Sequence, residues 1–107
     1  MSFNINELFS IAGKTAIVTG GSRGIGKMIA EGYVENGVKT YITARKAEAC
    51  LRTAEELSKK GECIAFPADL SSKEGRESFV EQIKSHEERI DILVNNAGAA
   101  WGAAFEE

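Results

Sequence analysis

The sequence predicts an α/β fold: a doubly wound parallel sheet with strand order 3-2-1-4, of which these 107 residues form the first half. Two observations lead to this prediction. Segments with strand character and segments with helix character alternate strictly from residue 15 to residue 96. The strand-like segments are short apolar or β-branched runs, which are typical of strands buried in a parallel sheet. No linker or repeat interrupts the chain, so we expect one domain over residues 1–107.

The first strand, helix and second strand follow from "TAIVTG" onward. Residues 15–20 form the first strand, which glycine closes, and a helix begins at Gly24. Gly37 is suited to a left-handed position at the end of this helix. The β-branched and aromatic run "VKTYITA", residues 38–44, is the second strand. The apolar positions that we expect on the buried face of the helix are Ile25, Met28, Ile29 and Tyr33.

Two further helices and two strands complete the alternation. An amphipathic helix over residues 46–61 stops at Gly61, and a short third strand, residues 62–69, is ended by Pro67. A helix over residues 71–90 is capped by Ser71 or Ser72 and leads into the fourth strand, residues 91–98. The positions expected to be buried are Ala47, Cys50, Leu51, Ala54 and Leu57 in the first of these helices, and Phe79, Val80 and Ile83 in the second.

Composition and charge exclude several classes of function. The residues are 43% hydrophobic and 27% charged, as in soluble globular proteins, and the net charge of −3 gives no reason to expect nucleic acid as a partner. Cys50, Cys63 and the single histidine, His86, lack the spacing of a metal site. The N-terminus lacks the features of a signal peptide, and no apolar run reaches the length of a membrane span. We therefore expect a soluble, cytoplasmic protein with free thiols.

The stretch "TGGSRGIGKM" could bind phosphate in two ways. From Gly21 it reads G-x-x-x-x-G-K, which is one residue short of the P-loop of nucleoside triphosphatases. A P-loop needs Ser or Thr after its lysine as a magnesium ligand, but Met28 follows Lys27. A P-loop protein also needs an aspartate at the end of an apolar strand, but the apolar run "ILVNN" has Asn95 and Asn96 there. Two oxygen ligands are missing, so the P-loop interpretation fails.

A dinucleotide-binding turn fits the same stretch better. Gly20 would let the chain turn sharply out of the strand, Gly24 would let the backbone approach a pyrophosphate, and Gly26 would let the helix pack close to the sheet. The first amides of the helix and the helix dipole then favour an anion. The alternative is a glycine-rich turn without a ligand. The position of the turn, where the strand order reverses, favours binding and a Rossmann-type fold.

The end of the second strand indicates which dinucleotide binds. An NAD site places an Asp or Glu there to accept hydrogen bonds from ribose hydroxyls, but this sequence has Ala44 and Arg45. Arg45 can pair with a 2′-phosphate, and Arg23 in the glycine turn can reach the same group. Each arginine alone could be an ordinary surface charge. Together, and without the acid, they favour NADP over NAD.

The motifs "TGGSRGIG", "ADL" and "NNAG", in this order, resemble the N-terminal half of a short-chain dehydrogenase/reductase. Stretches such as "ITARKAEAC" and "ILVNNAGAAWGAA" are similar to NADPH-dependent 3-oxoacyl reductases of the branch named for rhamnolipid synthesis. The resemblance implies that Arg45 holds the 2′-phosphate, and it assigns Asn95 a structural role. The other cofactor-contacting residues that it implies are Gly20, Gly21, Ser22, Arg23 and Ile25 at the adenosine and pyrophosphate end, Asp69 and Leu70 beside the adenine, and Asn96, Ala97 and Gly98 beside the nicotinamide ribose.

The resemblance also implies a catalytic Tyr-x-x-x-Lys pair, which these residues do not contain. Tyr33 and Tyr41 are followed four positions later by Gly37 and Arg45. We therefore expect no catalytic residue here, a domain truncated after the fourth strand, and a fourth strand with an exposed edge. The full-length form would be a homo-oligomer acting on a small carbonyl substrate, such as a 3-oxoacyl thioester. We expect the cofactor half of a reductase; the alternatives are a non-catalytic NADP-binding module and an interaction fragment without a ligand.

Overall fold

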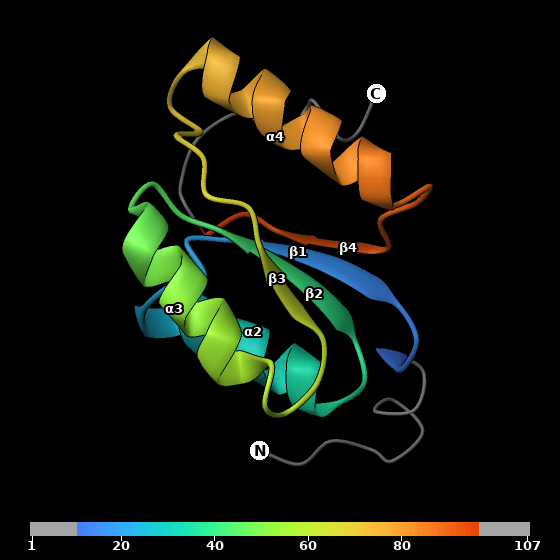
Figure 1. Cartoon of the computed structure of the whole chain (residues 1–107). Helices are drawn as coiled ribbons and strands as arrows, with labels where there is room; N and C mark the ends of the chain where they lie inside the picture. The colour runs from blue at the N-terminus through green and yellow to red at the C-terminus, as the bar shows by residue number, and fades with distance from the viewer. Residues whose placement is uncertain (1–10, 97–107) are drawn as a thin grey trace.

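A four-stranded, all-parallel sheet in the order β3-β2-β1-β4 organises the computed structural model, which describes residues 11–96 (Figure 1). The predicted strand order is confirmed. The chain runs through β1 (Thr15–Thr19), α2 (Gly24–Glu35), β2 (Lys39–Thr43), α3 (Ala47–Leu57), β3 (Cys63–Ala65), α4 (Lys73–His86) and β4 (Ile92–Val94). Because β1 lies between β2 and β4, the strand order reverses beside β1, and the turn that follows this strand emerges at the reversal.

The β1 strand is the buried centre of the sheet. All five of its residues are buried, and Ile17 is in register with Tyr41 of β2 and Leu93 of β4. The β3 strand is shorter than predicted, but the Phe66 and Ala68 amides after it still donate to the carbonyl oxygens of β2 and its extension, at 3.0 and 3.2 Å. The α4 helix begins, as predicted, at a serine cap: the Ser72 hydroxyl accepts a hydrogen bond from the Gly75 amide.

The helices cover the two faces of the sheet unequally. Figure 1 shows α2 and α3 on one face and α4 on the other. Under α2 and α3 the buried core consists of Val18, Ala30, Val34, Ile42, Cys50, Ala54, Leu57 and Cys63. Under α4 it consists of Ile17, Tyr41, Leu70, Phe79 and Ile83. Within the part of the chain that the structure describes, β4 pairs with β1 alone, and its three residues are half-buried.

The predicted buried face of α2 was partly wrong. Ile25 and Met28 are 68% and 71% exposed. The helix instead buries Gly26, Ala30 and Val34, which recur every four residues and therefore lie on one side. The small residues Gly26 and Ala30 allow the helix to pack close to the sheet on this side. Ile25 and Met28 lie on other sides of the helix and are therefore exposed. Ile29 and Tyr33 are partly buried, as predicted.

The α3 and α4 helices show the same kind of deviation. In α3, Ala47 and Leu51 are exposed, while Thr53 is buried in their place. The Thr53 hydroxyl donates to the Ser22 carbonyl oxygen at 3.1 Å, so this polar residue is buried with its hydrogen bond satisfied. In α4, Phe79 and Ile83 are buried, but Val80 is only half-buried.

A carboxylate at the end of α4 ties this helix to the sheet. Glu87 Oε2 accepts a hydrogen bond from the Tyr41 hydroxyl at 2.6 Å and forms an ion pair with Lys39 Nζ at 2.6 Å. These two hydrogen bonds, that of Lys39 first, lower the pKa of Glu87 below its ordinary value of 4.5. The ion pair therefore stabilises the fold at pH values above 4.5, the pKa of Glu87 in the unfolded chain. This stabilisation is lost as the pH falls through the lower pKa that Glu87 has in the folded protein.

We expect Glu87→Gln to lower the free energy of unfolding by about 1 kcal/mol at pH 7, since it removes the charge that faces Lys39. The difference between the variant and the unaltered chain should shrink as the pH falls below the ordinary value of 4.5 and through the lowered folded-state value, because Glu87 then becomes protonated in both states. A series of urea unfolding measurements from pH 7 downward tests this. Glu48→Gln, on an exposed pair with Arg52, is the control and should change little. A pH-independent difference for Glu87→Gln would contradict the role of the charge.

Candidate functional site

The turn between β1 and α2 takes a path that glycine permits. Gly20 and Gly24 have φ values of +65° and +61°, in the left-handed region that other residues rarely adopt. The Gly20 amide donates to the Thr43 carbonyl oxygen at 2.9 Å, which anchors the turn to the end of β2. The chain thus reverses directly above the ends of β1 and β2, and α2 starts there.

Two other glycines pack the turn against its surroundings. A Cβ atom on Gly26 would fall on the Gly20 carbonyl oxygen and lie 2.7 Å from Asn96 Nδ2. A Cβ atom on Gly21 would lie 2.8 Å from Ile42 Cγ2. Both contacts are closer than side chains allow. Gly26 therefore sets how closely the first turn of α2 approaches β1, as expected from the sequence.

The end of β4 is tied to the same turn through Thr19. The Asn96 amide donates to Thr19 Oγ1 at 2.8 Å, and this hydroxyl lies 3.3 Å from the Val94 carbonyl oxygen and 3.4 Å from Asn95 Oδ1. Asn95 and Asn96 thus connect β4 to β1, in agreement with the structural role expected for Asn95. They also bring the Asn96 side chain over Gly20 and Gly26.

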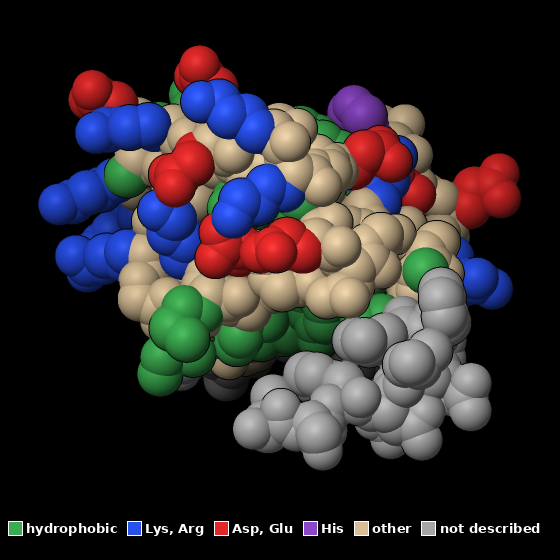
Figure 2. Space-filling view, turned by 90° about the horizontal axis from the view of Figure 1, so that it is seen from below, with side chains coloured by type: hydrophobic (Ala, Val, Ile, Leu, Met, Phe, Trp, Pro, Cys, Tyr) green, Lys and Arg blue, Asp and Glu red, His purple; other side chains and the backbone are tan. Residues whose placement is uncertain are grey.

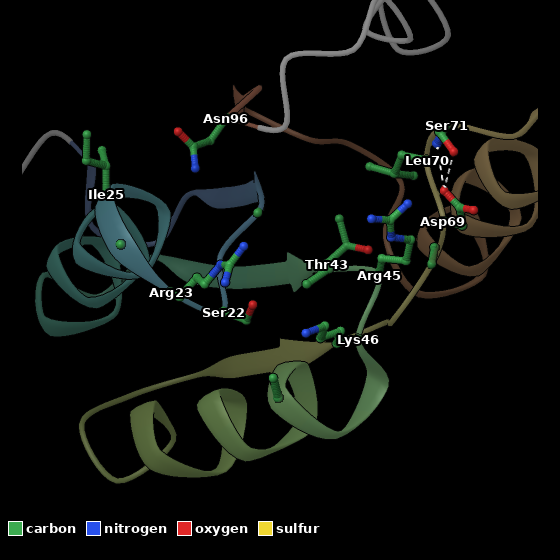
Figure 3. Close-up of a pocket in the computed structure, with 15 residues that line it drawn as sticks. Ser22, Arg23, Ile25, Thr43, Arg45, Lys46, Asp69, Leu70, Ser71 and Asn96 are labelled. Atoms are coloured by element: carbon green, nitrogen blue, oxygen red, sulfur yellow. Dashed lines mark hydrogen bonds between the residues drawn. The ribbon is translucent and has the colours of Figure 1, made fainter.

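A cleft of about 850 Å³ opens at this end of the sheet (Figure 3). Nine of the sequence-predicted site residues line it: Gly20, Ser22, Arg23, Gly24, Ile25, Arg45, Asp69, Leu70 and Asn96. Gly21 and Gly26 do not line it but support the turn beneath it. Ala97 and Gly98 lie outside the described residues. Residues separated by more than seventy positions therefore meet at one site, because the carboxyl ends of parallel strands share one edge of the sheet.

The cleft is strongly cationic. Arg23, Arg45 and Lys46 line it, and none of the three side chains forms a hydrogen bond or ion pair with any residue in the range 11–96. Lys and Arg side chains gather at the left edge of Figure 2, the side on which the strands end in Figure 1. A pocket with three unpaired cations beside a helix N-terminus is suited to a ligand with several phosphates.

Asp69 is the only acidic residue that lines the described part of the cleft. Its Oδ1 accepts hydrogen bonds from the Ser71 hydroxyl at 2.6 Å and from the Ser71 amide at 3.0 Å. These bonds, and then the charge of Arg45, lower the pKa of Asp69 below its ordinary value. The carboxylate is therefore ionised and oriented, with Oδ2 left to accept from a donor such as an amino group.

Sequence reasoning missed several residues of the cleft, notably Thr43, Lys46 and Ser71. Lys46 was placed in a helix by its pattern, although its position directly after Arg45 is a signal that could have found it. Ser71 was considered only as a helix cap. Thr43 is buried at the end of β2, and its hydroxyl has no hydrogen-bond partner in the described part of the chain. Unsatisfied polar groups of this kind are uncommon and are tolerated at functional sites.

The described residues of the cleft include no tyrosine, histidine or cysteine. Both cysteines are buried in the core under α2 and α3, and burial raises the pKa of Cys50 to about 11 and that of Cys63 to about 12. These thiols are poor nucleophiles at neutral pH. Residues 11–96 contain no cluster of three metal-ligating side chains and no helix long and apolar enough to cross a bilayer. What these residues provide is a cleft whose cationic side chains are suited to an anionic ligand.

The chain is similar in sequence to known reductases. The family described as short chain dehydrogenase matches residues 14–107. Over 102 residues the chain is 56% identical to the rhamnolipids biosynthesis 3-oxoacyl-(acyl-carrier-protein) reductase of Pseudomonas aeruginosa, a match that covers 95% of this chain and 40% of that protein. The chain therefore spans less than half the length of this relative.

Solved structures share the fold. The Pseudomonas aeruginosa RhlG/NADP active-site complex matches with a TM-score of 0.81 and 52% identity, over 92% of this chain and 40% of that one. The L-sorbose reductase from Gluconobacter frateurii, complexed with NADPH and L-sorbose, matches with a TM-score of 0.78 and 37% identity, over 83% of this chain and 35% of that one. At these identities the likeness extends beyond the fold to the sequence.

Proposed function

Because the chain belongs to the short-chain dehydrogenase family, we propose that it is the cofactor-binding part of an oxidoreductase that transfers hydride from NADPH to a carbonyl group. The observation that carries this proposal is the cleft at the end of β2, which has three unpaired cations and no acid at the position where an NAD site needs one. Bound NADPH would supply the hydride. The residues of this chain would bind and orient it.

The residues of the cleft fit the parts of this cofactor. The pyrophosphate would lie against the amides of the turn at Gly24, where the α2 helix dipole favours negative charge. Arg23 and Arg45 would bind the 2′-phosphate, and Asp69 and Leu70 would flank the adenine. The remaining contacts, at the nicotinamide ribose, are proposed for Asn96, Ala97 and Gly98.

We propose a 3-oxoacyl thioester as the substrate class, on the basis of the 56% identity to a 3-oxoacyl reductase. The proton donor for the carbonyl oxygen is not proposed among these residues. Tyr41 is 1% exposed and hydrogen-bonded to Glu87, and Tyr33 packs against the core under α2 and α3. Neither tyrosine lines the cleft. We therefore expect the 107 residues alone to bind NADPH without reducing a carbonyl.

Cytoplasmic location, in keeping with two free thiols, and a homo-oligomeric full-length form remain predictions.

Calorimetric titration of the chain with NADPH and then with NADH tests this function. We expect NADPH to bind at least about tenfold more tightly, because only NADPH carries the phosphate that the cations can pair with. Circular dichroism would first establish that the chain is folded. Equal affinity for the two nucleotides would contradict the NADP assignment. A folded chain that binds neither would contradict the cofactor site.

A further inference from the structure

The side chains of Arg45 and Lys46, which follow the end of β2, point in different directions. Lys46 has extended backbone angles, φ −83° and ψ 104°, and successive side chains of an extended chain point to opposite sides. Figure 3 shows this divergence: Arg45 extends toward Asp69, whereas Lys46 extends toward Ser22 and Arg23 on the glycine turn. The cleft between the glycine turn and α3 is therefore bounded by Lys46 on one side and Arg23 on the other.

Lys46 has no counter-charge among the described residues, unlike Lys27 and Lys60. Lys27 of α2 forms an ion pair with Glu56 of α3 at 3.1 Å, and Lys60, just after α3, forms one with Glu31 of α2 at 2.7 Å. Lys46 lines the cleft and forms no such pair with a described residue. An unpaired ammonium group that faces a second unpaired cation is unfavourable unless an anion lies between them.

The backbone around Lys46 also favours an anion. The first turn of α3 has no side-chain cap, and Ala49 of this turn lines the cleft. Its uncapped amides add partial positive charge on the same side as Lys46. The glycine turn opposite is held in place, because the Thr53 hydroxyl of α3 donates to the Ser22 carbonyl oxygen. The two walls are thus fixed relative to each other.

We propose that Lys46 is a further specificity-determining residue of this site: its ammonium group, together with Arg23 across the cleft, binds the 2′-phosphate that distinguishes NADPH from NADH. The inference rests on the proposed function. Arg45 then closes the other side of the phosphate, next to Asp69, so that the group is bound from three directions.

Binding of adenosine 2′,5′-bisphosphate and of 5′-AMP to the full 107-residue chain tests this role. These probes differ only in the 2′-phosphate and need only the adenosine end of the cleft, so they report on the site even if NADPH binds poorly. We expect Lys46→Gln to weaken binding of the bisphosphate about tenfold and to leave binding of AMP within about twofold. Lys46→Arg, which keeps the charge, should restore most of the affinity.

Lys59→Gln is the matched control. Lys59 is exposed, lies just after the C-terminal end of α3 and does not line the cleft. Its substitution by glutamine removes the same charge as Lys46→Gln. It should change neither affinity. Unchanged bisphosphate binding by Lys46→Gln, or an equal loss of both ligands, would overturn the role of Lys46. If the unaltered chain itself does not prefer the bisphosphate to AMP, the proposed NADP function fails, and this inference fails with it.

Discussion

Gly26→Ala should lower the free energy of unfolding by about 1–3 kcal/mol or more and abolish measurable NADPH binding. The added methyl group would fall on the Gly20 carbonyl oxygen and lie 2.7 Å from Asn96 Nδ2. The Gly20 backbone cannot easily move away, because the Gly20 amide donates a hydrogen bond to the Thr43 carbonyl oxygen. Relief requires α2 to move away from β1, and its amides would then leave the proposed pyrophosphate position. Urea unfolding and calorimetry measure the two effects.

Two other glycines provide controls for this substitution. Gly32 lies in the same helix with open space around it, so Gly32→Ala should stabilise the chain by about 0.5–1 kcal/mol through helix propensity. Gly24 also has open space but has a φ of +61°, so Gly24→Ala should cost about 1 kcal/mol through backbone strain alone. If Gly26→Ala resembled Gly32→Ala in stability, the close approach of α2 to the turn would be contradicted.

Arg45→Asp should reduce NADPH affinity about 30- to 100-fold and leave NADH binding unchanged or slightly stronger. The substitution removes a charge-assisted contact worth about 2–3 kcal/mol and places a carboxylate where it would repel the 2′-phosphate. The same carboxylate could accept hydrogen bonds from the ribose hydroxyls of NADH, as in NAD sites. Calorimetric titration of the variant with both nucleotides gives the change in preference.

Arg52→Asp is the control for this charge reversal. Arg52 lies on α3, is exposed and does not line the cleft, and within residues 11–96 its ion pair is with Glu48. The net charge changes by the same amount, so a general electrostatic effect would appear in both variants. An equal loss of NADPH affinity in both would contradict a local role for Arg45.

The alternation and the glycine turn were predictable because they depend on local chemistry. Apolar β-branched runs identify buried strands, and the parallel order 3-2-1-4 follows from the crossover rule, as the structure confirms. The sharp turn at Gly20 and the close packing at Gly26 were predictable because each requires a conformation or a contact that only glycine permits. The absence of an acid beside Arg45 is visible in the sequence without any structure.

What escaped prediction depends on tertiary packing and side-chain direction. The periodicity predicts that Ile25 and Met28 lie on the buried face of α2. In the structure Gly26 packs directly against the glycine turn, so the side of the helix that carries Gly26 faces the sheet and Ile25 and Met28 face solvent. Lys46 is the first residue of the helix predicted over residues 46–61. Only the observed backbone shows that its side chain points away from that of Arg45. The hydrogen bonds from Ser71 to Asp69 likewise depend on a loop conformation that no motif specifies.

The most direct test of the account is a crystal structure of the chain with NADPH. We expect the pyrophosphate at the amides of the turn at Gly24 and the 2′-phosphate within hydrogen-bonding distance of Arg23, Arg45 and Lys46. The adenine should lie between Asp69 and Leu70. A nucleotide bound away from the carboxyl ends of β1 and β2, or bound here with its 2′-phosphate directed away from these cations, would contradict the account.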